Sequence, residues 1–315
     1  MTVTALIHSI YFETPNHMAS REPSNWNDKL ELPGKVRFMD GNGDLPMLNV
    51  TTEWSSAEIY LHGAHVTHFQ RKNEPPLLFL SQVSQFAADK PIRGGIPVIL
   101  PWFGPREGQP MHGFARTSAW ELKQIVPAKD GSITLHFQLI AQETAGFPPF
   151  TADYLVTVSN TLALQLSVTN NSKDKEMIFE ECLHTYFHVG DISAVSITGL
   201  KGASYLDKVD GFTQKTETAD AIKVSSEVDR VYQDTTATVE IHDANLHRKI
   251  IVEKQNSAST VVWNPWIAKA QAMSDFGDNE YLNMVCVESG NVGKNKITLA
   301  PGKSFSFGVR LSTAN

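Results

Sequence analysis

The sequence predicts an all-β protein, a large antiparallel β-sandwich with few short helices. Apolar residues alternate with polar ones along most of the chain, and a period of two is typical of strands with one buried face. Turn pairs such as Asp130-Gly131 and Pro301-Gly302 separate the alternating runs. No segment shows the long, capped period of 3.6 residues that marks a long helix. Two large sheets packed face to face would bury the apolar faces of these strands.

The individual elements follow from the same alternation. One face of the run 133–139 carries Ile133, Leu135, Phe137 and Leu139. The runs 162–168 and 304–311 repeat this pattern and are the next clearest strands. Further strands are expected, in chain order, at 57–69, 154–158, 178–189, 238–242, 249–253, 260–263 and 282–288. Short helices are expected around 81–88 and 267–274.

The domain organisation is expected to be simple. Residues 14–34 contain three prolines and a glycine, so residues 1–34 are interpreted as a loosely packed lead-in. The rest has no internal repeat and no linker rich in Pro, Ser or Gly. Residues 35–315 are therefore predicted to form a single β-sandwich catalytic domain.

Composition excludes several classes of function. The 315 residues are 41% hydrophobic and 19% charged, with a net charge of −7, so the basic field of a nucleic-acid binder is lacking. No signal peptide is recognised, and no run approaches the roughly 18 apolar residues of a membrane-spanning helix. Two cysteines are too few for a disulfide framework. A cytoplasmic protein is expected, and an anionic ligand would need local arginines to attract it against the overall charge.

Polar residues concentrate in the strand predicted near residues 180–191. Alternation places Glu180, Cys182, His184, Tyr186 and His188 on one side of this strand. Two histidines, a tyrosine and a carboxylate would suit the lining of a cleft. A solvated outer face of the sheet is the alternative.

Glu288 follows the apolar run Val285–Val287 and shares a strand face with Met284 and Cys286. It is expected at the end of a buried strand, just before a turn containing Gly290. Burial there would raise the pKa of the carboxyl group, which suits a general base acting near neutrality. A surface carboxylate at a strand end is the alternative.

The segment 91–116 is rich in glycine and proline and is expected to be an ordered loop region. Arg93 and Arg116 flank it, and arginine is the side chain best suited to fork onto phosphate oxygens. Trp102 and Phe103 offer flat apolar surfaces that could cover the C–H face of a sugar ring. Surface arginines and core aromatic residues are the alternative.

No metal or cofactor is expected. His62, His65 and His68 are spaced by three, which brings side chains together on a helix but not on the strand or bend expected here. The chain has no HExxH motif, no P-loop and no Rossmann glycine motif. A hydrolase built on Cys182 and His184 stays open, although nothing in the sequence orients that pair.

A series of ordered motifs resembles the glucose-6-phosphate 1-epimerase family, within the galactose-mutarotase-like superfold. The similarity covers about residues 35–311 in the family's order. Its motifs are YLHGAHVTHF (60–69), FLSQVSQF (79–86), PIRGGIPV (91–98), PWFGP (101–105), HGFAR (112–116), LHTYFHVGDI (183–192), GLKGASYLDK (199–208), DRVY (229–232) and MVCVESGN (284–291).

The resemblance implies an isomerase that interconverts the α and β anomers of a hexose phosphate without a cofactor. His184 resembles the general acid that protonates the ring oxygen, and Glu288 resembles the base that accepts the proton of the anomeric hydroxyl. The two are expected to face each other across a pocket that spans the sugar. A monomer is expected, with a small-molecule substrate as its partner.

The same resemblance implies the substrate contacts. Arg93 and Arg116 correspond to the clamp for phosphate and substrate, and Asp229 to an acidic residue that holds sugar hydroxyls. His112 is expected to face the sugar. Met111 stands where many relatives have a substrate-binding glutamine, which leaves the substrate preference open. An epimerase for unphosphorylated aldoses and a non-catalytic sugar-phosphate-binding protein are the alternatives.

Overall fold

The computed structural model describes Leu32 and residues 34–314, and the predicted lead-in, residues 1–34, lies almost wholly outside this range. Antiparallel strands dominate the described residues, so the all-β prediction is confirmed. Within the described range, no helix is long and apolar enough to cross a membrane.

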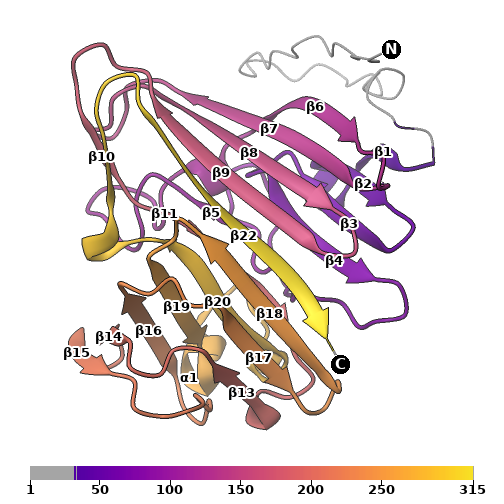
Figure 1. Ribbon diagram of the computed structural model, residues 1–315, viewed down its shortest axis with the longest axis vertical. Helices are drawn as coiled ribbons and strands as arrows, with labels where there is room; N and C mark the ends of the chain where they lie inside the picture. The colour runs from indigo at the N-terminus through magenta and orange to yellow at the C-terminus, as the bar shows by residue number, and fades with distance from the viewer. Residues whose placement is uncertain (1–31, 33, 315) are drawn as a thin grey trace.

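One eight-stranded sheet forms a continuous layer of the molecule (Figure 1). Its three nine-residue strands bury every second residue, which is the consequence of the alternation seen in the sequence. In spatial order its strands are β13 (Val195–Thr198), β17 (Val239–Asp243), β18 (Arg248–Gln255), β22 (Ser304–Ala314), β9 (Leu162–Asn170), β8 (Phe150–Val158), β7 (Ile133–Ala141) and β6 (Glu121–Pro127).

A second eight-stranded sheet carries the polar segments singled out in the sequence. Its path is β15 (Thr213–Thr216), β14 (Ser204–Asp207), β16 (Val228–Gln233), β19 (Ser259–Asn264), β20 (Met284–Asn291), β11 (Glu181–Leu183) and β5 (Val98–Ile99). The short β12 (Tyr186–His188) also pairs with β20.

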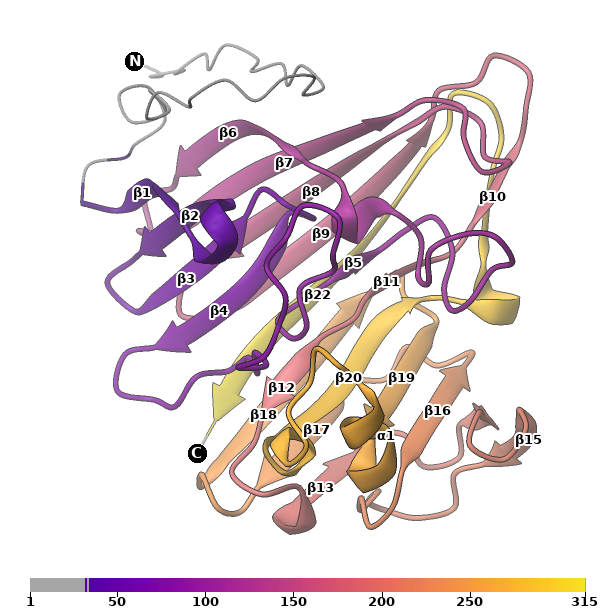
Figure 2. The same cartoon turned by 180° about the vertical axis from the view of Figure 1, so that it is seen from behind.

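Two smaller sheets complete the sandwich. Four consecutive strands form one of them: β1 (Val36–Asp40), β2 (Pro46–Thr51), β3 (Ser55–Tyr60) and β4 (His65–Arg71). The other pairs β10 (Met177–Phe179) with β21 (Ile297–Leu299). Seen from behind, the four-stranded sheet lies over β6–β9, and β20 passes in front of β18 (Figure 2). One apolar core runs between the layers and contains residues from all four sheets. The β10–β21 pair contributes Met177, Phe179 and Leu299 to it.

Helical structure is sparse, as predicted. α1 (Trp266–Ala272) confirms the helix expected around 267–274. The described part of the chain also contains five 3₁₀ segments: η1 (Asn42–Asp44), η2 (Ala115–Thr117), η3 (Ile192–Ala194), η4 (Glu280–Asn283) and η5 (Gly293–Asn295).

The helix expected at 81–88 is wrong, because this segment consists of turns, a bend and backbone without regular secondary structure. The Ser81 hydroxyl accepts a hydrogen bond from the Val83 amide, and the Ser84 hydroxyl accepts one from the Arg93 amide. Serine side chains that bond to the backbone in this way compete with the hydrogen bonds of a helix.

Two of the predicted strands are interrupted. The run 57–69 divides into β3 and β4 around a turn at Gly63, whose φ of +73° favours glycine. A side chain there would also meet the carbonyl of Arg116, since an added Cβ would lie 2.5 Å from its oxygen. The run 178–189 divides into β10, β11 and β12, and the break at residues 184–185 falls beside the centre of β20.

Candidate active site

His184 and Glu288 lie in direct contact on the second eight-stranded sheet. The register pairs Leu183 with Ser289 and Tyr186 with Cys286, so the break between β11 and β12 places His184 beside Glu288. His184 Nε2 is 3.2 Å from Glu288 Oε1. Both residues are buried, with 8% of His184 and 1% of Glu288 exposed.

The position of Glu288 corrects two expectations. It lies within β20, which continues to Asn291, and not at a strand end before a turn. Gly290 is part of the strand because β11 passes close to it: an added Cβ would lie 2.3 Å from the carbonyl oxygen of Glu181. The expected separation of the acid–base pair across a sugar-sized pocket is also wrong, because the two side chains touch.

The alternation of β20 explains why Glu288 faces the site. Val285 and Val287 point into the core between the layers. Met284 and Cys286 point to the opposite side, into a cluster covered by α1 and the segment that follows it. Glu288 shares the side of Met284 and Cys286, as the sequence predicts.

Burial disfavours charge on both members of the pair. Loss of water raises the pKa of Glu288 well above its ordinary value, and the nearby Asp229 raises it further. Loss of water also lowers the pKa of His184 well below its ordinary value, with further lowering by His112, Arg116 and Arg93. The Cys182 thiol donates a hydrogen bond to Glu288 Oε2, with the two atoms 3.5 Å apart. A proton shared by this pair therefore rests most stably on the carboxyl group.

Aromatic rings surround the imidazole of His184. Tyr186 stacks on it with ring centroids 4.8 Å apart and an angle of 16° between the planes. Trp263 and His112 meet it edge-on, at 6.2 and 5.7 Å respectively. His112 also contacts Phe103 edge-on. These rings hold the imidazole in one orientation and keep it largely out of water.

Arg93 reaches this cluster from the glycine- and proline-rich segment. Its Nε and Nη2 donate to Asp275 Oδ2 over 3.2 and 3.1 Å, and its Nη1 donates to the Tyr186 hydroxyl over 3.0 Å. Tyr186 and Asp275 raise the pKa of Arg93 above its ordinary value, so the guanidinium group stays charged. No sequence motif pointed to Asp275, which lies after α1 in a segment without a distinctive pattern.

Arg116 is near Arg93 and far less engaged. Its Nη2 donates a 2.6 Å hydrogen bond to the carbonyl oxygen of Met111. Burial, together with the charge of Arg93, lowers its pKa to about 10, so it too is positive at neutrality. The Met111 side chain is 52% exposed and contributes only its backbone to this arrangement.

The buried Asp229 forms an ion pair with the half-buried Lys208 beside Glu288. Lys208 Nζ is 2.8 Å from Asp229 Oδ2 and lies 5.8 Å from the centroid of the Phe103 ring. The positive charge of Lys208 acts on Glu288 by lowering its pKa against the effect of burial. Lys208 is the last residue of the GLKGASYLDK motif, so this motif was the signal in the sequence that pointed to it.

Other expected contacts lie elsewhere. Trp102 is buried in the main core with Arg106 over its ring, so of the two aromatic residues considered for a sugar face only Phe103 reaches the site. His62 and His65 each bond to a backbone carbonyl and do not gather with His68 into a metal site. Among the described residues, the one group of three potential metal ligands is His184, Cys286 and Glu288.

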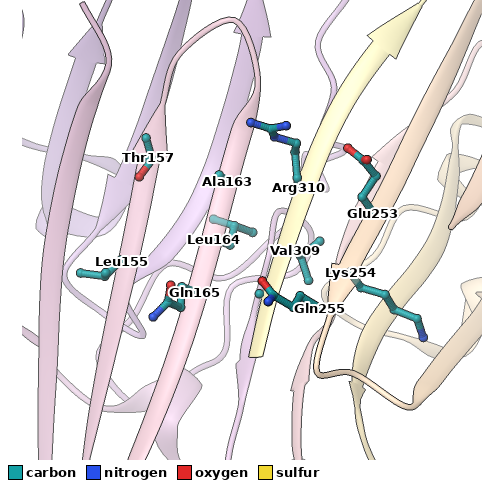
Figure 3. Close-up of a pocket in the computed structure, with 11 residues that line it drawn as sticks. Leu155, Thr157, Ala163, Leu164, Gln165, Glu253, Lys254, Gln255, Val309 and Arg310 are labelled. Atoms are coloured by element: carbon teal, nitrogen blue, oxygen red, sulfur yellow. The ribbon is translucent and has the colours of Figure 1, made fainter. Parts of the chain in front are cut away.

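A separate hollow lies on the first eight-stranded sheet, across β8, β9, β22 and β18 (Figure 3). Arg310 and Glu253 face each other on neighbouring strands there, with Ala163 and Gly308 leaving the space between larger side chains. Its lining has no histidine and only one carboxylate, so it offers no acid–base pair.

The profile of the aldose 1-epimerase family matches residues 47–312. The chain belongs to the aldose 1-epimerase family. This epimerase is 39% identical over 266 residues to a protein of Cenchrus ciliaris provisionally named glucose-6-phosphate 1-epimerase, covering 81% of this chain and 80% of that one.

Solved structures agree with this assignment. The epimerase resembles the crystal structure of a provisionally named mutarotase from Salmonella typhimurium with a TM-score of 0.83 and 30% identity, covering 90% of this chain and 95% of that one. A galactose mutarotase-like protein from Clostridium acetobutylicum shares the fold, with a TM-score of 0.69 and 15% identity over 89% of this chain and 98% of the other. The predicted galactose-mutarotase-like fold is therefore confirmed.

Proposed function

We propose that this epimerase interconverts the α and β anomers of a hexose 6-phosphate, with His184 and Glu288 as the proton-transfer pair. The observation that carries the proposal is the 3.2 Å contact of these two buried side chains, with Arg93, Arg116 and Lys208 placed around them. The name of the Cenchrus ciliaris relative supports glucose 6-phosphate as the substrate.

The chemistry explains why the pair is close together. Mutarotation opens the hemiacetal, rotates the C1–C2 bond and closes the ring on the other face of C1. One group gives a proton to the ring oxygen while another accepts the proton of the C1 hydroxyl. Both oxygens are bonded to C1, so two catalytic groups that touch each other can reach them together. A pair separated by the width of a sugar could not do so.

Assignment of the roles requires His184 to be charged and Glu288 to be ionised when the sugar is bound. The free site favours the opposite distribution, because burial and the charges of Arg93 and Arg116 lower the pKa of His184. A phosphate bound to those arginines would neutralise their charge and so raise the pKa of His184. On this basis the phosphate both anchors the substrate and moves the shared proton onto the imidazole.

Ring closure returns each proton to its origin. Neutral His184 takes the proton back from the C5 hydroxyl as it attacks C1, and Glu288 returns its proton to the carbonyl oxygen. The pair therefore ends each cycle as it began. Asp229, His112 and Phe103 are proposed as contacts for the sugar, because each adjoins the acid–base pair or the Lys208–Asp229 pair.

The test follows the approach to anomeric equilibrium of freshly dissolved α-glucose 6-phosphate by polarimetry. Glu288→Gln and His184→Asn should each lower kcat by about 10²–10⁴-fold, the usual contribution of a positioned proton-transfer group. The double variant should lose little more than the worse single variant, because the two groups act as a unit. Full activity in either single variant would disprove the assigned roles.

One observation favours unphosphorylated aldoses as a second candidate substrate class. Arg93 already has an anionic partner in Asp275, so its charge is compensated without a phosphate. The comparison of phosphorylated and neutral sugars in an Arg93 variant separates the two candidates.

A further inference from the structure

A cysteine sulfur lies beside the acid–base pair without a role in the proposed proton transfers. One potential ligand atom from each of His184, Cys286 and Glu288 lies within 4.8 Å of the other two. All three residues are buried. Cys286 projects from the same face of β20 as Glu288, two residues away, and pairs across the sheet with Tyr186 and Trp263.

We propose that His184, Cys286 and Glu288 form a binding site for a thiophilic divalent cation of the class of Zn²⁺, and that the bound ion reversibly inhibits the enzyme. Inhibition rests on the proposed roles of His184 and Glu288, whereas binding of the ion does not.

The ligand types fit such an ion. Zinc is bound in proteins by thiolate, imidazole and carboxylate groups, and three protein ligands with one further position open form a common arrangement. A thiolate ligand selects against Mg²⁺ and Ca²⁺, which take oxygen ligands. Zinc–ligand bonds of about 2.0–2.3 Å place tetrahedral ligands roughly 3.5 Å apart. The widest pair of the cluster, at up to 4.8 Å, must therefore close by about an ångström, a movement that small side-chain rotations supply.

The charge balance favours the complex in a buried site. The ion displaces one proton from the Cys286 thiol and one from the Glu288 carboxyl group, while neutral His184 binds through a ring nitrogen. A charge of +2 then meets two single negative charges, and the complex is neutral. Exchange of two protons for one dication therefore leaves no uncompensated charge in the buried site.

Access to the site is from the side of His184, whose side chain is 11% exposed while that of Glu288 is 1% exposed. The ion would occupy the two groups needed for proton transfer, so substrate and ion should exclude each other. Lys208 and Arg93 lie nearby with their partners Asp229 and Asp275, which offset the repulsion that these cations would exert on an approaching dication.

Cobalt provides a direct probe, because a Co²⁺–thiolate bond gives a ligand-to-metal charge-transfer absorption that oxygen and nitrogen ligands do not. The chain has only two cysteines, Cys182 and Cys286, so single substitutions identify the sulfur that binds. The full-length protein is titrated anaerobically with CoCl₂, and mutarotation is measured on the same samples. One equivalent of Co²⁺ should produce the thiolate band, with activity falling in parallel and returning after addition of EDTA. Zn²⁺ should displace Co²⁺, and Mg²⁺ should do neither.

Cys286→Ser should abolish the thiolate band and weaken inhibition by Zn²⁺ at least about tenfold, since loss of even an outer partner of a metal site costs that much. Cys182→Ser is the matched control. Its sulfur contacts Glu288 but lies outside the group of three, so the band and the inhibition should remain. Cys286→Ala serves in place of Cys286→Ser if the buried hydroxyl impairs folding, as judged by circular dichroism.

The proposal is overturned if the wild-type protein gives no thiolate band, or if the band survives in both Cys286 variants. If the band disappears in Cys182→Ser instead, the metal-binding sulfur is that of Cys182 and the proposal is overturned as well. If the band forms as expected in a protein without mutarotase activity, metal binding is supported and the proposed enzymatic function fails separately.

Discussion

Arg93 provides the sharpest test of the phosphate as part of the substrate. A guanidinium group has five N–H donors, and three of those in Arg93 are directed at Asp275 and Tyr186. Two donors, one on each terminal nitrogen, are left to fork onto phosphate oxygens. Hydrogen bonds to charged groups contribute about 1.5–3 kcal/mol each, so replacing Arg93 by methionine should cost roughly 3 kcal/mol or more on a phosphorylated sugar.

This free energy corresponds to a loss of about a hundredfold or more in kcat/KM for glucose 6-phosphate. The assay is polarimetry with both glucose 6-phosphate and galactose, at substrate concentrations well below KM. The loss on the neutral sugar should be far smaller, because it offers no phosphate to either donor. Equal losses on the two sugars would refute the phosphate role and favour the unphosphorylated substrate.

Two controls separate the phosphate contact from structural effects. Tyr186→Phe removes the same hydrogen bond from Arg93 Nη1 while it keeps the guanidinium group. Tyr186→Phe should change the rate on the two sugars equally. The size of that change measures how much of the loss in Arg93→Met comes from the missing bond to Tyr186, whose ring stacks on His184. Arg93→Met also leaves Asp275 without its cation, although that side chain is 17% exposed and can regain water, so thermal unfolding is measured on each variant.

Three further predictions concern buried polar groups. Burial raises the pKa of Glu181 to about 8, so the folded protein keeps a proton that the unfolded chain releases above its ordinary pKa near 4.5, and stability should fall as pH rises between these values. Glu181→Gln should remove that slope in urea denaturation and stabilise the protein by roughly 3 kcal/mol near pH 7, whereas an unchanged slope would contradict the assignment. Lys208→Met should lower kcat/KM for glucose 6-phosphate by more than tenfold, because it raises the pKa of Glu288 and leaves Asp229 with only the more distant Lys269, 4.0 Å away; a parallel rise in the pH at which the rate develops would identify the cause. Asn264→Leu should destabilise the fold by about 2–4 kcal/mol in the same urea assay, because the carbonyls of residues 281 and 284 lose their only described side-chain donor; a change below the error of the measurement would contradict this.

Much of the fold could be predicted because alternation is a local signal. Ile133–Ala141 and Leu162–Asn170 bury every second residue, as their sequences indicate. The break at residues 184–185 could not be predicted in this way, because it depends on the register with β20 and not on local composition. The false helix at 81–88 has a similar cause in part, since the Ser84 hydroxyl accepts a hydrogen bond from the amide of Arg93, a residue outside the segment that the fold brings near, whereas the bond of Ser81 to Val83 is local.

The features of the candidate site also fall into those that local sequence predicts and those that depend on contacts between distant segments. The raised pKa of Glu288 followed from its apolar neighbours, and its direction is as expected. The contact with His184, the Asp275 partner of Arg93 and the exposure of Met111 all depend on loops and strands distant in sequence. Arg93 and Arg116 are close to each other, yet the roles assigned to both stay predictions until substrates are measured.

Gly290 helps to determine the distance between the two proposed proton-transfer groups, His184 and Glu288. His184 follows β11, and Glu288 lies on β20. Because Gly290 has no side chain, these two strands can approach closely enough to form their backbone hydrogen bonds. Adjacent strands have a spacing that varies little, about 4.7–4.9 Å, so the sheet sets the distance between the side chains of His184 and Glu288. Most of the residues proposed to meet the rest of the sugar, Arg93, Phe103, His112 and Arg116, come from the loops of the segment 91–116. Exchange of those loops between relatives could therefore diversify the sugars accepted while the distance between acid and base is inherited unchanged.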